Sequence, residues 1–252
     1  MQTKYYGWGF PIDISKHGPQ IDQLINILHV FMLVLFVGWG TFFVYTLIRF
    51  RKREGHKAEY HGKHLKTPTY LEAGVALTEF VILFVFAIPI WHALRNDFPP
   101  RDKSVQVRVV AEQFAWNIHY PGRDGIYGKS DSALVSSTNP LGMDPNDPNG
   151  KDDIIMLNQL HIPVNTPVIV DLSSKDVIHS FSIPVMRVKQ DAIPGQVVPL
   201  WFEAKETGNF EIACAQLCGL GHYRMRGFFI VDTKEDYKKW LEEQAAEKAK
   251  QV

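Results

Sequence analysis

The segment "CAQLCGLGHYRM", residues 214–225, places several metal-binding side chains within a short stretch of this 252-residue chain. It contains the only two cysteines, Cys214 and Cys218, and these are followed by His222 and Met225. Thiols, an imidazole and a thioether at this spacing favour either a metal site or a disulfide.

Three interpretations of this segment compete. A disulfide between Cys214 and Cys218 would close a very short loop, would stabilise the chain little, and would leave the histidine and the methionine unexplained. Zinc would take the two thiolates, His222 and one distant histidine. Copper suits the whole set, because soft sulfur stabilises Cu(I) and nitrogen accommodates Cu(II).

An upstream histidine strengthens the copper interpretation. His179, in "KDVIHSF", precedes Cys214 by 35 residues and supplies an imidazole from a different predicted strand. Two cysteines four positions apart can also bridge two copper ions, with one histidine for each ion. The spacing therefore favours copper, while zinc and a disulfide stay open.

Two apolar runs precede this region. Residues 23–48 contain no Asp, Glu, Lys or Arg, and "EAGVALTEFVILFVFAIPIWHAL" ends just before Arg95. A hydrocarbon core needs about 20 apolar residues per helix, so both runs predict membrane-spanning helices. A buried helical hairpin in a soluble protein is the alternative.

The loop between the two runs indicates their orientation. Its sequence, "RFRKREGHKAEYHGKHLK", contains seven Lys and Arg residues, which predicts a cytoplasmic loop and two outward-facing termini. The first 20 residues lack the pattern of a cleavable signal, so either the first span is an uncleaved signal or processing has occurred upstream. The 27 basic and 27 acidic residues balance, which does not indicate nucleic acid as a partner.

The remainder of the chain reads as an all-β domain. "VQVRVVAEQFAWNIHY" predicts strand, a long Gly-, Pro-, Asn- and Asp-rich loop follows, and short β-like runs then recur between turns. This pattern predicts a sandwich or barrel. We expect four parts: an external N-terminal segment at 1–22, a transmembrane hairpin at 23–97 with its cytoplasmic loop at about 49–70, a β domain at 98–234, and a helical tail at 235–252.

These motifs together resemble subunit II of cytochrome c oxidase, a haem–copper oxidase subunit, over nearly the whole chain. The resemblance lies in C-x-x-x-C-x-x-x-H-x-x-M, in the upstream "DVIHSF", and in "KQDAIPG" and "EQFAWNIHY". It implies an α+β membrane protein, in which a two-helix transmembrane hairpin is followed by a cupredoxin-like all-β sandwich. It also implies a bacterial inner membrane, with the copper domain in the periplasm or on the outer face.

The resemblance further implies a binuclear copper centre, CuA. Its ligands would be the side chains of His179, Cys214, Cys218, His222 and Met225 and the backbone carbonyl of Gln216. The family commonly has Glu at the position of Gln216, where the carboxylate helps to hold magnesium against subunit I. A hard divalent ion prefers anionic oxygen, so this sequence does not favour magnesium there.

Four other residues take roles from the resemblance. Electrons would enter at Phe114 or Trp116, where the family has aromatic residues. Glu72 matches a glutamate at the cytoplasmic mouth of a proton path, although an interfacial carboxylate without that role is the alternative. Asp191 is placed towards subunit I, although hydrogen bonding at a turn also explains it.

The implied function is the respiratory-chain subunit through which electrons enter cytochrome c oxidase. Its partners would be subunit I and other oxidase subunits, membrane lipid, and cytochrome c or another periplasmic donor. The chain lacks the site where oxygen is reduced and proton pumping is driven, so it is one part of an oxidoreductase and translocase. Three alternatives are the CuA subunit of an oxidase-like nitric oxide reductase, a copper-free quinol oxidase subunit, and a metal-free or zinc-stapled membrane-anchored module.

Overall fold

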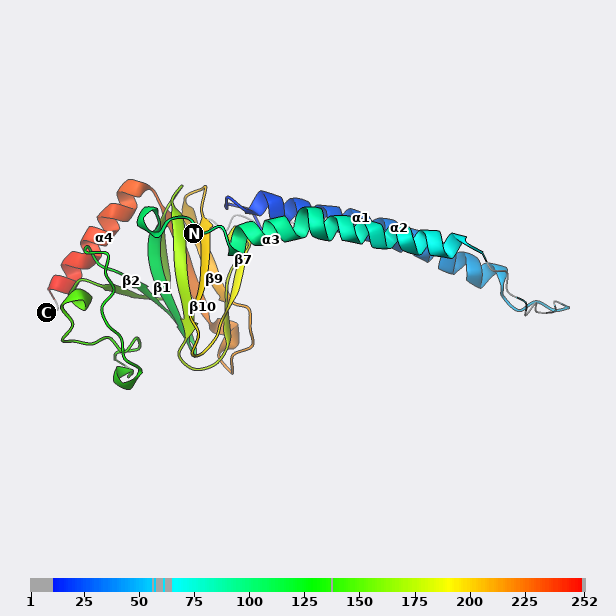
Figure 1. Ribbon diagram of the computed structural model, residues 1–252. Coiled ribbons are helices and arrows are strands. Elements are labelled where there is room, and N and C mark those ends of the chain that lie inside the picture. Colours follow the sequence, from blue (N-terminus) through cyan, green and yellow to red (C-terminus); the bar gives the residue numbers. More distant parts are fainter. Residues whose placement is uncertain (1–10, 56, 58–60, 62–64, 137, 251–252) are drawn as a thin grey trace. The chain divides into compact units, whose positions relative to one another are not determined.

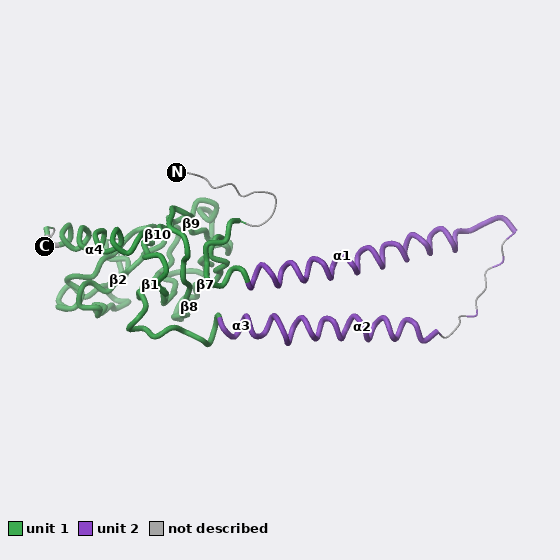
Figure 2. Tube along the Cα trace, turned by 90° about the horizontal axis from the view of Figure 1, so that it is seen from above, with its two compact units in different colours: residues 1–19, 94–252 green, residues 20–93 purple. Residues whose placement is uncertain are grey.

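The computed structural model describes residues 11–55, 57, 61, 65–136 and 138–250, and these form two units (Figures 1 and 2). The larger unit contains the described residues up to Pro19 and those from Leu94 onward. The smaller unit is Gln20–Ala93. The larger unit is thus built from residues that precede the helical region in the sequence and from residues that follow it.

The smaller unit consists of two long apolar helices. Helix α1 spans Gly18–Arg49, and the second helix, Thr67–Arg95, comprises α2 (Thr67–Val81), a π-helical segment η1 (Ile82–Ala87) and α3 (Ile88–Arg95). At about 1.5 Å per residue, both exceed the roughly 30 Å of a bilayer core. Large apolar side chains along them are exposed, as expected of helices that meet lipid or other membrane helices.

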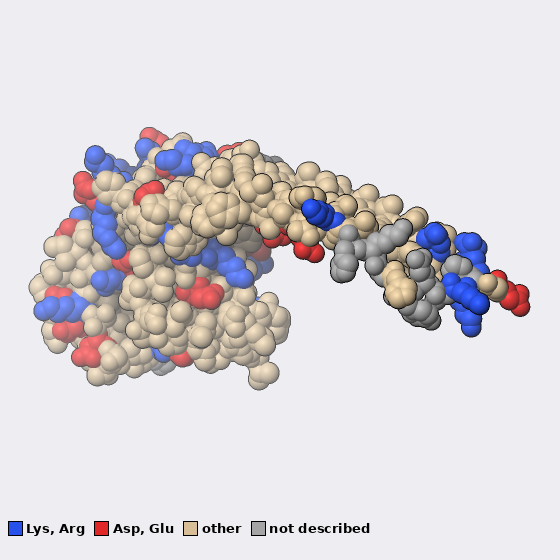
Figure 3. All heavy atoms as spheres, turned by 45° about the vertical axis from the view of Figure 1, so that its right-hand side comes forward, with Lys and Arg blue, Asp and Glu red and all other residues tan. Residues whose placement is uncertain are grey.

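Basic side chains gather at one end of the helical unit, where the chain leaves α1 (Figure 3). Arg49, Arg51, Lys52 and Arg53 follow one another there and are exposed. Residues 56, 58–60 and 62–64 of the predicted cytoplasmic loop, including Lys63, lie outside the described residues, as do residues 1–10 of the predicted external segment. The apolar part of α1 is thus followed directly by positively charged residues.

The larger unit contains two five-stranded sheets (Figure 1). In spatial order, the first sheet contains β3 (Ile154–Leu157), β2 (Ala115–Tyr120), β1 (Val105–Glu112), β5 (Pro167–Ser174) and β8 (Val198–Glu203). The second contains β4 (Gln159–Pro163), β10 (Arg226–Asp232), β9 (Gly208–Cys214), β6 (His179–Ile183) and β7 (Val188–Ala192). Most neighbouring strands are antiparallel, but β1 with β5 and β4 with β10 are parallel.

The inner faces of the two sheets share one apolar core. Strand β1 alternates between buried and less buried residues, the pattern of a strand with one face towards a core. Aromatic rings join the sheets: Trp116 meets Phe181 edge-on at a centroid distance of 5.4 Å, and Phe202 meets Phe229 at 6.0 Å. The predicted β-sandwich is therefore confirmed.

Asn158 ties the two sheets together where the chain crosses from β3 to β4. It has a left-handed backbone conformation, φ 60°, which Asn tolerates better than most residues. Its side-chain oxygen accepts from the Trp116 amide at 2.8 Å, and its own carbonyl accepts from the Phe228 amide at 2.7 Å. One residue thus bonds β2 of the first sheet and β10 of the second.

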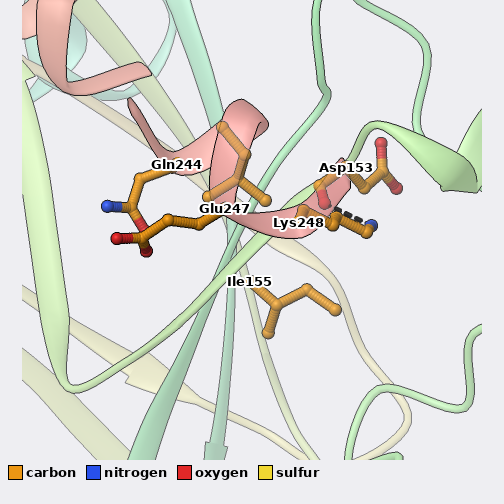
Figure 4. Close-up of a pocket in the computed structure, with 6 residues that line it drawn as sticks. Asp153, Ile155, Gln244, Glu247 and Lys248 are labelled. Carbon is orange, nitrogen blue, oxygen red and sulfur yellow. Dashed lines mark hydrogen bonds between the residues drawn. The ribbon is translucent and has the colours of Figure 1, made fainter. Parts of the chain in front are cut away.

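Helix α4 (Lys234–Ala249) forms the predicted C-terminal helix and packs on the sandwich. The Thr233 hydroxyl accepts from the Asp236 amide at 3.1 Å and caps the helix, and the Trp240 ring stacks on His161 at 4.2 Å. Near the end of α4, the Lys248 ammonium donates to the backbone carbonyls of Gly150, at 3.0 Å, and Asp153 (Figure 4). The small cleft beside this contact contains none of the site residues predicted from the sequence.

The N-terminal segment is attached to strand β8. Ile14 is buried in the core, and its carbonyl accepts from the Lys205 amide at 2.7 Å. The buried Glu203 carboxylate accepts from the ammonium groups of Lys16, at 2.7 Å, and Lys205, at 2.8 Å. Burial alone would raise the pKa of Glu203, but these two hydrogen bonds outweigh it and lower the pKa below its ordinary 4.5.

We expect Glu203→Gln to lower the stability of the β domain at neutral pH by about 1 kcal/mol, because both lysines lose a charged partner but are partly exposed. The lowered pKa means that Glu203 stabilises the fold above pH 4.5, and that this contribution disappears as the pH falls through the folded-state pKa. Thermal unfolding of the full chain in detergent, followed by circular dichroism from pH 7 downwards, measures this. Glu242→Gln on the exposed face of α4 is the control, and a loss independent of pH would contradict the expectation.

Candidate metal centre

The loop that carries the cysteines, residues 214–225 (the cysteine loop), joins the antiparallel strands β9 and β10. The Cys214 amide donates to the Met225 carbonyl at 3.2 Å and closes the loop at its base. On the other side of β9, Cys214 pairs in register with Phe181 of β6, and the Ala215 amide donates to the Ser180 carbonyl at 2.9 Å. This pairing brings the end of β9 beside His179, the first residue of β6.

The structure brings all five side chains predicted from the sequence together. The two cysteines are free thiols with their Sγ atoms 3.8 Å apart. The Nδ1 atom of His179 lies 3.2 Å from the Met225 sulfur and 4.0 Å from the Cys214 sulfur. The Cys218 sulfur lies 3.7 Å from both the Met225 sulfur and His222 Nδ1.

These separations fit a metal site. Ligand atoms about 2.0–2.3 Å from a shared metal lie roughly 3–4 Å from one another, the range that the five side chains show. The carbonyl of Gln216, 3.2 Å from the Cys214 sulfur, faces the same cluster. In particular, the ligand atoms of His179, Cys214 and Cys218 all lie within 4.8 Å of one another.

His179 is oriented by a carboxylate. Its Nε2 donates to Asp176 Oδ1 at 2.9 Å, which directs Nδ1 towards the sulfur atoms. A carboxylate behind a histidine in this way fixes its tautomer and is typical of metal-binding histidines. Burial would raise the pKa of Asp176, but hydrogen bonds from His179 and from the Gln113 and Val177 amides lower it. In the sequence, the only sign of this role is that Asp176 lies three residues before His179.

The two thiols differ in their surroundings. Cys218 is buried, whereas Cys214 is partly exposed. Burial, followed by the neighbouring Cys214 thiol, raises the pKa of Cys218 to about 11. A buried thiol of this kind becomes a thiolate when a metal cation supplies the compensating positive charge. The donor set and its burial therefore fit a bound metal.

The turn between β1 and β2 covers part of the cysteine loop. The Phe114 ring lies so close to two loop glycines that an added Cβ would be 2.4 Å from Phe114 Cδ2 at Gly221 and 3.2 Å from Phe114 Cζ at Gly219. The Phe114 side chain is half-buried. Trp116 is fully buried, with its ring 6.2 Å from that of His179. Only the first of these two predicted aromatics therefore has surface that a docking protein can reach.

Glu72 and Asp191 lie elsewhere. Glu72 is an exposed residue of α2 in the helical unit. Asp191 is exposed on the edge strand β7, where it pairs with Ser180, the residue after His179. Among the described residues, no side-chain hydrogen bond or ion pair joins Asp191 to the cysteine loop. Their proposed roles therefore depend on subunits outside this chain.

The cysteine loop also presents apolar side chains to solvent, which the sequence alone does not predict. Leu217, Leu220 and Tyr223 are 77%, 98% and 87% exposed. Their places between the ligands were visible in the sequence, but their outward direction follows from the loop's conformation. Exposed apolar groups clustered at a functional site commonly mark contact with another protein.

Comparison with known proteins reveals a consistent set of relatives. The family model for the periplasmic domain of cytochrome c oxidase subunit II matches residues 105–231. The chain is 36% identical over 238 residues to the alternative cytochrome c oxidase subunit 2 of Bradyrhizobium diazoefficiens, covering 94% of this chain and 84% of that protein. It is 27% identical over 249 residues to cytochrome c oxidase subunit 2 of Cereibacter sphaeroides, covering 94% and 80%.

Solved structures include a similar domain. The periplasmic domain of cytochrome oxidase subunit II from Bradyrhizobium japonicum is 28% identical to this chain and superposes with a TM-score of 0.44. The match covers 59% of this chain and 97% of that domain.

We expect Gly221→Ala to destabilise the cysteine loop, because its methyl group would overlap the Phe114 ring. Overpacking of this kind costs about 1–3 kcal/mol, measured as the free energy of unfolding. The effect should shrink in a Phe114→Ala background, where the overlapping ring is absent. Equal costs of Gly221→Ala in both backgrounds would show that the ring is not the cause.

Proposed function

The chain belongs to the cytochrome c oxidase subunit II family, and we propose that its cysteine loop is the binuclear copper site of this electron-accepting subunit. It is a membrane-anchored part of a haem–copper oxidase and acts together with the subunit that reduces oxygen. The family match, residues 105–231, covers most of the sandwich and includes every residue of the proposed copper site.

The observation that supports this proposal is the mutual contact of five soft and intermediate donor atoms. Cys214 and Cys218 would hold the copper ions as thiolates; their sulfur atoms lie 3.8 Å apart and form no disulfide. His179 Nδ1 approaches them from the first residue of β6, whereas the Met225 sulfur and His222 Nδ1 approach from the cysteine loop. The Gln216 carbonyl completes the set.

This donor set favours copper over zinc and over a disulfide. Structural zinc takes four ligands, and here five side chains and one carbonyl converge. Thiolate, imidazole and thioether together are typical of redox copper, which would supply a one-electron acceptor when bound. A disulfide would use the two thiols and leave His179, oriented by Asp176, without a ligand role. Gln216 has no carboxylate, so we do not propose magnesium at this loop.

We propose that the donor is cytochrome c and that it docks over Phe114. The ring is half-buried against Gly219 and Gly221, so a protein that covers it also approaches the cysteine loop. The apolar Leu220 and Tyr223 side chains belong to the same loop and would lose their exposure on docking. Trp116 is too deeply buried for such contact; its ring instead meets those of Phe181 and His179 edge-on.

The helical unit and two exposed carboxylates are proposed to act at the membrane and against subunit I. The basic residues after α1 support a cytoplasmic loop, which would put the sandwich in the periplasm of a bacterial inner membrane. Glu72, near the start of α2, would then lie close to the cytoplasmic surface and serve at the mouth of a proton path in subunit I. Asp191, exposed on the edge strand β7, is proposed to face subunit I.

We expect the full chain in detergent to bind two copper ions and to show an electron paramagnetic resonance signal shared equally by two copper nuclei. Cys218→Ser should lose the second ion and the shared signal, because one bridging sulfur is missing. Ala215→Ser, which adds the same hydroxyl to the loop but keeps both thiols, is the matched control. One copper with a blue-copper spectrum, or retained zinc, in the unsubstituted chain would refute the copper pair.

We expect Phe114→Ala to slow electron transfer from cytochrome c to the assembled oxidase by on the order of 10- to 100-fold, because the ring positions the donor. Copper content should not change, since Phe114 provides no ligand atom. Phe114→Trp should restore the rate, and Ile155→Ala on the exposed edge strand β3 should have no effect. Stopped-flow mixing with reduced cytochrome c measures it; an unchanged rate would exclude Phe114 as the docking contact.

A further inference from the structure

Gln113, the residue before Phe114, reaches the cysteine loop from a distant part of the chain. Its side chain is exposed and is not held by packing in the core. Even so, its Nε2 donates to the Cys218 carbonyl at 2.6 Å, across a separation of 105 residues. A long polar side chain loses conformational entropy when it is held in one place, so this bond orders a group that would otherwise move in water.

The backbone of the same residue is connected to the histidine side of the site. The Gln113 amide donates to Asp176 Oδ2 at 2.7 Å, and the other oxygen of that carboxylate accepts from His179 Nε2. Gln113 therefore contacts, directly or through one carboxylate, both the Cys218 peptide and the His179 ring. Cys218 and His179 are two different proposed copper ligands.

Gly219 shows how tightly the turn and the loop fit together. Its φ of +133° lies in a region that favours glycine, and an added Cβ would be 2.7 Å from Gln113 Nε2 and 3.2 Å from Phe114 Cζ. The backbone at Gly219 thus lies against both the amide and the ring. A movement of the loop at Gly219 would therefore push the Phe114 ring out of place. The hydrogen bond from Gln113 to the Cys218 carbonyl opposes such a movement.

We infer that Gln113 is a positioning residue that holds the turn with Phe114 in a fixed place on the cysteine loop, an inference that rests on the proposed function. The hydrogen bond to the Cys218 carbonyl orients the peptide next to a bridging thiol, and the amide bond to Asp176 orients the opposite imidazole. The Cys218 carbonyl would find water if the bond were lost, so the fold survives without Gln113. What is lost is the fixed relation between the docking contact and the metal ligands.

The test uses two substitutions of similar length. Gln113→Met removes the N–H donor, and Gln113→Lys keeps an N–H donor of comparable reach. Gln159→Met, an exposed glutamine of β4, is the control for the loss of an amide. Copper loss from the full chain to a chelator, and electron transfer from cytochrome c to the assembled oxidase, are measured for each. Amide hydrogen exchange of the loop in the copper-free chain gives a readout that needs no metal.

We expect Gln113→Met to lose copper to the chelator on the order of 10- to 100-fold faster and to accept electrons on the order of 10- to 100-fold more slowly, the effect typical of groups that orient metal ligands. Loop amides should exchange faster in Gln113→Met, whereas Gln113→Lys should resemble the unsubstituted chain in all three measurements. The inference is overturned if Gln113→Met matches the unsubstituted chain, or if Gln113→Lys is equally impaired.

The same experiment separates this inference from the copper proposal. If the unsubstituted chain fails to bind two copper ions, the proposed function is refuted. The hydrogen-exchange comparison then still decides whether Gln113 holds the loop. Normal copper binding with unchanged exchange in Gln113→Met would refute the positioning role alone.

Discussion

The site depends on one constraint: two thiols must be held at contact distance without bonding, beside an imidazole that enters from another strand. The register of β6 against β9 provides this, because Cys214 pairs with Phe181, two residues after His179. A shift by one residue would turn the histidine to the opposite face of the sheet. The sandwich core, with Trp116 and Phe181 packed edge to face behind His179, keeps that register in place.

The proposed ligands could be predicted from the sequence because their chemistry is local. Cys214, Cys218, His222 and Met225 lie within one loop, and no other short stretch combines thiols with imidazole and thioether. The long apolar runs and the alternating strands likewise depend on neighbouring residues alone. The strands β3 and β7 carry no such local signal: one has four residues and the other contains Lys, Gln and Asp, and both lie at sheet edges, where little burial is required.

Groups that act through distant contacts could not be predicted in the same way. Asp176 and Gln113 are ordinary polar residues in the sequence, and their significance appears only when β1, β5 and the cysteine loop meet. The parallel pairing of β1 with β5 is also invisible to local pattern, yet it places Glu112 and Gln113 near the end of β5, where Asp176 follows. The pairing of strands far apart in the sequence thus brings Asp176 and Gln113 to the site. Most of the proposed ligands, by contrast, lie within one short loop.

The two proposed histidine ligands are not equivalent, and this asymmetry bears on how the subunit is assembled. His179 is fully buried and oriented by Asp176, whereas His222 is partly exposed and lies on a loop with the outward side chains Leu220 and Tyr223. A protein that covers this loop therefore meets His222 before His179. The inner histidine is oriented by a carboxylate of this chain, and the outer one lies where a neighbouring protein can alter its surroundings.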